Sequence, residues 1–326
     1  MRIVVSIPVH ENPEVVLDQV SNIKKYVPGV VIVLHTSEEF CDEFDAFACT
    51  QEDSYEEMYV NPTHLHVDWG DGTLMDVHIS NFKYMCGLMD FDYFVLHASN
   101  DMYVKNGFQD YISEYDAGFQ RHIIKEFSQW WPGNKALKDG QLYYIMNEVG
   151  GENIIASQVE GSFYKKDIFQ KIIDTIDKSE FLRDYGLKYT REEIVFPTVA
   201  DALVDEGKRG YPTVFSEVHT FDRKLWRTRH ITWGIFHRSG LCKIVPRYLY
   251  DQFEKRNEER LVASNSWKIR PAVVRKIIKG NRSFIKKNMF LFDARTRYQL
   301  YDGHFYSVKR VKRDNSDKLR RYINSL

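Results

Sequence analysis

Residues 90–107, DFDYFVLHASNDMYVKNG, decide how the rest of the chain is interpreted. The first half, residues 92–97, is rich in aromatic and branched side chains, which is typical of a short buried strand. The second half turns polar at Ser99, Asn100 and Asp101. Ligands of open α/β sheets bind beyond the carboxyl ends of strands, so this position predicts a ligand-facing carboxylate at Asp101. The same residues also favour turns, and position alone supports both interpretations equally.

The N-terminal residues predict a strand–helix–strand unit. Residues 2–9 form an apolar run, and Asn12-Pro13-Glu14 is typical of a helix N-terminus. Apolar residues then recur at roughly helical spacing until Pro28-Gly29, and residues 30–34 form a second apolar run. Short loops between such segments predict a parallel sheet with a right-handed crossover.

Two further segments extend this pattern. Residues 64–67, in which His64 and His66 alternate, predict a third strand, and residues 73–89 predict a helix that leads into the strand quoted above. Residues 38–57 contain nine acidic residues and no basic one, which predicts a solvent-facing loop or helix. The two histidines could ligate a metal, but no carboxylate or cysteine has a supporting spacing. We therefore interpret them as polar residues satisfied by hydrogen bonds.

The chain has 326 residues, a length that suits one large α/β domain or two smaller ones. Its charge is distributed unevenly along the sequence. The net charge is −1, but residues 270–326 contain 16 Lys or Arg and 4 Asp or Glu, out of totals of 45 and 46. A basic segment can bind phosphates, anionic membranes or nucleic acids, or it can be a solvated face. Within it, residues 309–321 predict a basic surface helix.

The cysteines and the N-terminal residues bear on the cellular compartment. The four cysteines, Cys41, Cys49, Cys86 and Cys242, form no CxxC pair, which argues against a zinc site. Few cysteines in a long chain predict a cytosolic protein with free thiols. The chain starts directly with a strand pattern, without the long apolar run of a signal peptide or a membrane span.

A second notable stretch is residues 191–199, REEIVFPTV. Glu192 and Glu193 precede an apolar run that Pro197 interrupts. Carboxylates in the first turn of a helix are favoured by its dipole, which is the simpler interpretation. The alternative is a catalytic base at the edge of a cleft.

Several short motifs occur in an order and spacing that resemble a known family. They are Ser6-Ile7-Pro8-Val9-His10, Val33-Leu34-His35, Val67-Asp68-Trp69, Ser99-Asn100-Asp101 with Lys105, Gly161-Ser162, Glu192-Glu193 with Thr198, and His230-Ile231-Thr232-Trp233. Together they resemble the core-2/I-branching β-1,6-N-acetylglucosaminyltransferases and the related peptide-O-xylosyltransferases. Members of this family are inverting GT-A-type enzymes that use UDP-sugars. The resemblance covers roughly residues 1–240.

The resemblance implies a fold and a set of site residues. The implied fold is a GT-A-like, Rossmann-type α/β fold, with a mixed, mainly parallel sheet flanked by helices and a basic helical C-terminal segment. Residues 1–240 would form the catalytic domain that binds donor and acceptor, and residues 241–326 would complete the diphosphate site. The catalytic base would be Glu193. The donor would be bound by Val9, His10, Ser37, Asp101, Arg270 and Arg295, and the acceptor by Trp233, Glu160, Gly161 and Ser162.

The implied activity is the inverting transfer of a GlcNAc-like or xylose-like sugar from a UDP-sugar to a hydroxyl of a glycan or lipid-linked glycan, in surface polysaccharide synthesis. Residues 99–101 contain one carboxylate in place of an Asp-x-Asp pair, so we expect arginines to replace a metal and no cofactor to be required. We expect a cytoplasmic protein whose basic tail contacts the anionic inner membrane. Nucleic acid is not an expected partner.

Other functions stay open at this point. The departures from the family pattern at Ser37 and Asn100 leave room for a non-catalytic sugar- or nucleotide-binding module on the same fold. A metal-dependent GT-A transferase that uses Asp101 is a second alternative. A nucleic-acid binder that uses the basic tail would show salt-sensitive binding, but no RNA-binding motif supports it.

Overall fold

Two apolar, β-branched runs form the centre of the sheet. β1 (Ile3–Val9) and β2 (Val31–Thr36) are almost entirely buried, which suits parallel strands covered by helices on both faces. They pair in parallel, with Val4 opposite Val31. The computed structural model describes residues 1–48, 57–68, 70–124, 131–179, 187–215, 234–246, 248–250, 252–253, 256, 269–280 and 304–326.

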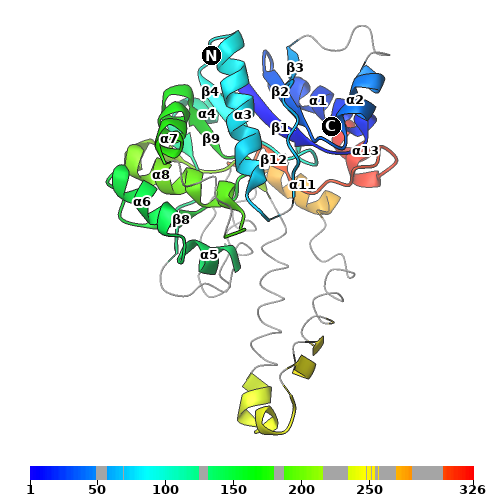
Figure 1. Ribbon diagram of the computed structural model, residues 1–326. Coiled ribbons are helices and arrows are strands. Elements are labelled where there is room, and N and C mark those ends of the chain that lie inside the picture. Colours follow the sequence, from blue (N-terminus) through cyan, green and yellow to red (C-terminus); the bar gives the residue numbers. More distant parts are fainter. Residues whose placement is uncertain are drawn as a thin grey trace.

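The main sheet has seven strands in the order β10-β6-β9-β4-β1-β2-β3 (Figure 1). Strands β4, β1, β2 and β3 are parallel to one another, and β9 is antiparallel to both of its neighbours. The predicted mixed, mainly parallel sheet flanked by helices is therefore confirmed. Besides β1 and β2, the sheet contains β3 (Met58–Val60), β4 (Tyr93–Leu96), β6 (Ala117–Gly118), β9 (Phe163–Lys165) and β10 (Arg209–Gly210).

Helices cover both faces of the sheet because successive strand residues point to opposite sides. Ile3 and Val5 pack in one core with α1 (Pro13–Tyr26), α2 (Cys41–Ala48) and α4 (Phe108–Ser113). Val4 packs in the other core. The helices on that face are α3 (Thr73–Leu88), α6 (Gly140–Glu148), α7 (Lys166–Lys178) and α8 (Val195–Leu203). The result is a sheet between two helical layers.

The start of α1 follows the sequence prediction. Asn12 adopts the left-handed conformation at the N-cap, and its side chain accepts a hydrogen bond from the Val15 N–H at 3.3 Å. Pro13 occupies the first turn, where its missing N–H costs nothing. The helix ends at Tyr26, just before Pro28-Gly29.

A third core joins the described C-terminal residues to the carboxyl edge of the sheet. It contains apolar residues of β5 (Met102–Tyr103), β11 (Val214–Phe215), α11 (Pro271–Ile278), β12 (Ser307–Val308) and α13 (Lys318–Asn324). β12 pairs with both β11 and β5 in a second sheet.

The division of the chain into two domains at residue 240 stays a prediction. The remaining elements are β7 (His122–Ile124), β8 (Ile154–Ala156), α5 (Trp131–Ala136) and the 3-10 turns η2 (Arg191–Glu193), η3 (Glu206–Lys208) and η4 (Leu241–Lys243).

Two predicted elements are wrong. Residues 64–67 are not a strand, because they cross the end of β2 and bond to its side chains: the Leu65 N–H donates to His35 Nε2 at 3.2 Å. β3 forms earlier, at Met58–Val60. Residues 309–321 are also not one surface helix. They follow β12 directly, and the helix α13 begins only at Lys318.

Thiols and helix lengths can be stated for the described residues. Cys41 and Cys86 are free, as the sequence predicts for these two. None of the helices in the described ranges combines the length and the apolar character needed to cross a lipid bilayer.

Gly161→Ala is expected to destabilise the fold. Gly161 has φ +78°, and a Cβ there would lie 2.5 Å from the Val214 backbone nitrogen. The clash and the backbone strain together should cost at least about 2 kcal/mol in the free energy of unfolding, measured by denaturant titration. Gly140→Ala is the matched control, since a Cβ at Gly140 meets nothing within 4 Å. Equal stability of the two variants would contradict this account.

Candidate active site

The strand order places a switch point between β1 and β4. From β1 the chain moves to β2 and β3 on one side, and then crosses to β4 on the other side. In open α/β sheets, ligands bind beyond the carboxyl ends of strands at such a point. His10 follows β1 there, and Ala98 to Asp101 follow β4. These ends define the candidate active site.

A buried polar network supports this edge from the α3 side. Ser6 of β1 lies 2.8 Å from His78 Nδ1 and accepts a hydrogen bond from Asn81 Nδ2 at 3.0 Å. Asn61 continues the network by donating to Asn81 Oδ1 at 2.9 Å. Burial lowers the pKa of His78 to about 3, so this histidine is neutral at physiological pH. The network therefore fixes the ends of β1 and β3 relative to α3 without adding charge.

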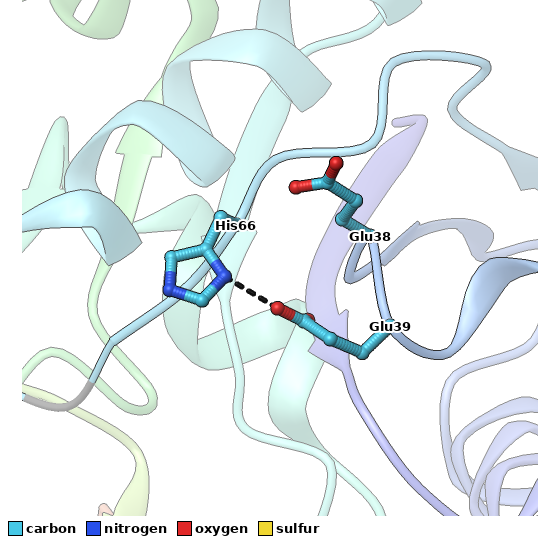
Figure 2. Close-up of side chains that lie close together, drawn as sticks. All are labelled: Glu38, Glu39 and His66. Carbon is cyan, nitrogen blue, oxygen red and sulfur yellow. Dashed lines mark hydrogen bonds and ion pairs between the residues drawn. The ribbon is translucent and has the colours of Figure 1, made fainter.

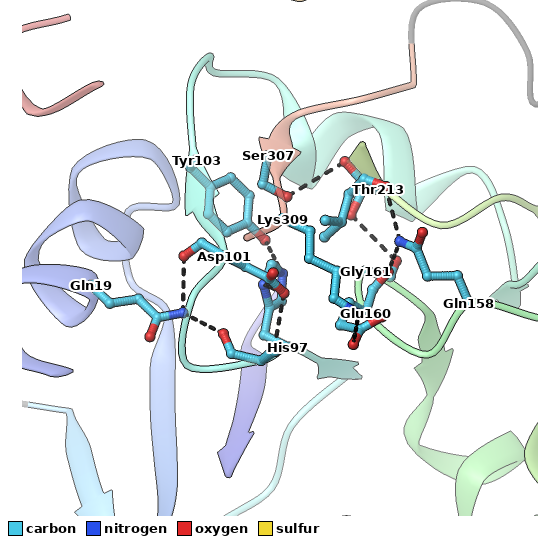
Figure 3. A network of polar contacts seen from close by, with 12 residues as sticks. Gln19, His97, Asp101, Tyr103, Gln158, Glu160, Gly161, Thr213, Ser307 and Lys309 are labelled. Atoms are coloured by element: carbon cyan, nitrogen blue, oxygen red, sulfur yellow. Dashed lines mark hydrogen bonds and ion pairs between the residues drawn. The ribbon is translucent and has the colours of Figure 1, made fainter. Parts of the chain in front are cut away.

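Asp101 lies in the turn after β4 and is fully buried. Its Oδ2 atom accepts a hydrogen bond from the Ala98 N–H at 2.9 Å and lies 3.3 Å from His97 Nδ1 (Figure 3). Tyr103 stacks on His97, and its hydroxyl lies 3.1 Å from His97 Nε2. This geometry fits the turn interpretation of Asp101. A role of Asp101 in donor binding stays a prediction.

The C-terminal residues bring positive charge to the same edge. Lys309, which follows β12, forms a mostly buried ion pair with Glu160 (Figure 3). Arg313 donates hydrogen bonds to Ser99 Oγ at 2.8 Å and to Glu11 Oε1 at 2.8 Å. Arg313 therefore connects the loops that follow β1 and β4.

These cations shift the titration of their neighbours. Burial, together with the charge of Arg313, lowers the pKa of His10. Burial alone would raise the pKa of Glu160, but the charge and the hydrogen bond of Lys309 outweigh it and lower that pKa. At neutral pH, His10 is neutral and Glu160 is ionised.

Glu192 and Glu193 lie in η2, immediately before α8, in different surroundings. Glu192 is 3% exposed; burial first, and then the charge of Glu193, raise its pKa well above the ordinary value. The negative charge of Glu160 also raises the pKa of Glu192, so these two carboxyl groups interact. Glu193 is partly buried, and its Oε2 atom accepts a hydrogen bond from Thr190 Oγ1 at 2.9 Å. The two adjacent glutamates therefore differ: burial favours the protonated form of Glu192, whereas Glu193 is partly exposed and holds a hydrogen bond from Thr190.

Most other predicted site residues lie at this edge, where several have structural roles. The Ser37 N–H donates to the Val9 carbonyl oxygen at 3.0 Å, which joins the ends of β2 and β1. The Gly161 N–H donates to the Leu96 carbonyl oxygen at 2.7 Å. The Ser162 hydroxyl donates to the Gln158 carbonyl oxygen at 2.7 Å. Together these bonds hold the backbone around the site.

For three other predicted site residues, no described contact bears on the prediction: one is exposed, and two lie outside the described part of the chain. Arg270 is exposed at the start of α11. Arg295 and Trp233 lie outside the described residues, as does Trp69 of the resembled motif.

Sequence reasoning missed the cationic residues Lys309 and Arg313. The basic composition of residues 309–321 predicts a surface helix, and a surface helix would not place these two side chains at the sheet edge. The run Phe305-Tyr306-Ser307-Val308 just before it is typical of a strand and could have placed the following basic residues at a sheet edge.

A second polar group, Glu38, Glu39 and His66, lies on the surface (Figure 2). The side-chain atoms that could bind a metal ion all lie within 4.8 Å of one another. In the described part of the chain, these three residues are the group that meets this criterion. His64 and His66 both have hydrogen-bond partners, Thr36 and Glu39, as the sequence predicts; sequence spacing did not indicate that Glu38 and Glu39 would lie beside His66. The hydrogen bond and the charge of Glu39 raise the pKa of His66. An exposed ion pair explains this arrangement without a metal.

Comparisons with known proteins give limited information. No protein-family model matches the chain, and no curated protein sequence does. Similar solved structures include the galactosyltransferase LgtC in complex with donor and acceptor sugar analogs, at a TM-score of 0.35 and 10% sequence identity, over 65% of this chain and 73% of that chain. An active-site mutant of LgtC gives a TM-score of 0.35 and 10% identity, over 65% and 72%. Scores of this size do not by themselves assign a function.

Glu192→Gln is expected to stabilise the protein at neutral pH. Burial raises the pKa of Glu192 in the folded state above its ordinary value of 4.5. When the pH rises above 4.5, Glu192 ionises more readily in the unfolded state than in the folded state. Ionisation therefore stabilises the unfolded state, and the free energy of unfolding of the wild type falls. The loss can reach about 1.4 kcal/mol per pH unit. The variant should therefore melt about 2 °C or more above wild type at pH 7 and show no difference below pH 4.5. The control is Glu206→Gln, whose side chain is 94% exposed. A lower melting temperature for Glu192→Gln than for wild type at neutral pH would contradict the raised pKa of Glu192.

Proposed function

We propose that this chain is a glycosyltransferase that moves a sugar from a UDP-sugar donor to a hydroxyl of a glycan or lipid-linked glycan. The observation that carries the proposal is the meeting of acidic and cationic side chains at the switch point between β1 and β4. Carboxylates accept hydrogen bonds from sugar hydroxyls, and guanidinium and ammonium groups bind phosphates. One edge of the sheet thus offers both halves of a nucleotide-sugar site.

Unpaired buried oxygens support a hydroxyl-rich ligand. Glu160 Oε2, Glu192 Oε2 and Asp101 Oδ1 are buried and have no hydrogen-bond partner among the described residues. Each such atom costs about 1–3 kcal/mol, so native structures keep few of them and often for function. The hydroxyls of a sugar would supply the missing donors with small adjustments of the loops after β4 and before β9.

The proposed reaction is a single displacement at the anomeric carbon with inversion. A base takes the proton of the acceptor hydroxyl as its oxygen attacks the sugar, and UDP leaves with the bonding electron pair. We assign the base to Glu193, as the family resemblance implies. Its carboxylate is partly exposed and accepts a hydrogen bond from Thr190, whereas Glu192 is buried and burial raises its pKa. A general base must be ionised and must lie within hydrogen-bond distance of the acceptor hydroxyl, and these requirements favour Glu193.

The leaving diphosphate needs positive charge, which we assign to arginine and lysine side chains in place of a metal. Arg313 joins the predicted Arg270 and Arg295 as a phosphate ligand, because it already lies beside Ser99 and His10. Fixed positive charge at a developing anion stabilises the transition state without reorganisation. The metal-dependent alternative through Asp101 is less favoured, since residues 99–101 contain a single carboxylate, whose Oδ2 atom is bonded to the Ala98 N–H. No cofactor is part of this proposal.

Glu193→Gln should abolish most transfer and most slow hydrolysis of the donor. Loss of a general base typically lowers the rate about a hundredfold to ten-thousandfold. The measurement is UDP release from a panel of UDP-sugars, with the exposed Glu206→Gln variant as the matched control. If Glu192→Gln loses the activity while Glu193→Gln keeps it, the base assignment is wrong. UDP release from none of the donors would favour a non-catalytic binding module.

UDP release should continue at an unchanged rate in EDTA. The positive charge that stabilises the leaving group belongs to the protein, so removing divalent cations leaves it in place. Assays in EDTA and in Mn²⁺ test this directly. Activity that disappears in EDTA and returns with Mn²⁺ would contradict metal independence. Repeating the assay with Glu39→Gln would then show whether the Glu38, Glu39 and His66 group holds the ion.

A further inference from the structure

Residues 234–253 form a separate projection, which we call the tip. Its described residues are 234–246, 248–250 and 252–253, drawn in yellow in Figure 1, where they lie away from the sheet and its helices. Within the tip, the rings of Phe236 and Tyr250 lie 4.8 Å apart. Gly240 has φ +72° and is followed by η4. The tip is therefore a folded turn with contacts between its two arms.

The tip exposes large apolar side chains. Ile244 is 80% exposed, Tyr248 61% and Ile235 57%. Three more are exposed by 40% or more: Leu241, Leu249 and Phe253. Scattered single apolar residues are ordinary on a protein surface, but a group of six in one short segment marks an interaction site.

The same segment is basic. Residues 234–253 contain three Lys or Arg and one acidic residue, Asp251, although the whole chain has a net charge of −1. In the described part of the tip, Arg238 and Lys243 are exposed beside the apolar residues. This net positive charge is complementary to an anionic surface.

We propose that the tip binds the surface of an anionic lipid bilayer. Exposed isoleucine, leucine and phenylalanine side chains can insert at the boundary between headgroups and acyl chains, tyrosines favour the interface, and lysine and arginine attract anionic lipids. A nucleic acid would use the basic side chains but would leave Ile244 and Ile235 in water. This inference does not depend on the proposed enzymatic activity.

The tip is a different surface from the basic tail, for which the sequence predicts a membrane contact. In the tail, Leu319, Arg320 and Ile323 are buried against the third core, so that α13 turns these side chains inward. The tip presents its apolar side chains outward.

The experiment is co-sedimentation of the full chain with vesicles of phosphatidylcholine alone and of phosphatidylcholine with an equal part of phosphatidylglycerol. We expect wild type to bind the anionic vesicles and to be released by high salt, since the attraction is screened. The double variant Ile235→Ser with Ile244→Ser should bind about tenfold more weakly, because two inserted side chains are lost. Leu88→Ser is the matched control, as Leu88 is 49% exposed outside the tip, and it should bind like wild type. Thermal melting checks that both variants fold.

Several results would overturn the proposal. Equal binding by wild type and the double variant would show that the tip is not the contact. Absence of wild-type binding to anionic vesicles would also refute it. Light scattering tests the competing occupant: a wild-type dimer that the double variant converts to a monomer, without vesicle binding, would show that a second copy covers the tip. Binding to a single-stranded oligonucleotide in place of vesicles would assign the surface to nucleic acid.

Discussion

The buried ion pair between Lys309 and Glu160 is the contact on which the candidate site depends. It joins residues 149 positions apart, and both side chains are mostly buried. Removing one partner of a buried pair typically costs about 3–5 kcal/mol, because the other charge stays buried and unpaired. Lys309 also lowers the pKa of Glu160 against the effect of burial, whereas burial raises the pKa of the nearby Glu192. The pair thereby sets both the shape and the charge of the edge.

The C-terminal helix holds the same arrangement from the other side. Arg320 is fully buried; it forms an ion pair with Asp18 of α1 and donates to the Lys312 carbonyl oxygen at 3.0 Å. Asn324 adds a bond of 2.6 Å to Asp18. These contacts fix the segment that carries Arg313 against α1, so that its guanidinium lies between the loops after β1 and β4. The last residues of the chain are thus part of the scaffold of the site.

The sequence predicts the local parts of this structure well. Continuous apolar runs indicate β1 and β2, and Asn12-Pro13 marks the start of α1, because strand burial and helix capping depend on neighbouring residues. The carboxyl end of β4 likewise appears from residues 92–101. The contacts that complete the site are different in kind. Arg313 bonds to Ser99 across 214 positions, and no local pattern specifies such a partner. Asp101 shows the same limit, since its turn was predicted but the stacking of His97 on Tyr103 beside it was not.

The most direct test of the central claim is a calorimetric titration of the protein with UDP in the presence of EDTA, comparing wild type, Arg313→Ala and Arg321→Ala. Arg321 is exposed on α13 and serves as the control. If the C-terminal segment supplies phosphate ligands to the edge between β1 and β4, loss of a charged hydrogen-bonding group should weaken UDP binding by about tenfold to a hundredfold in Arg313→Ala only. Equal affinity for UDP in Arg313→Ala and wild type, or no UDP binding by wild type, would contradict the account.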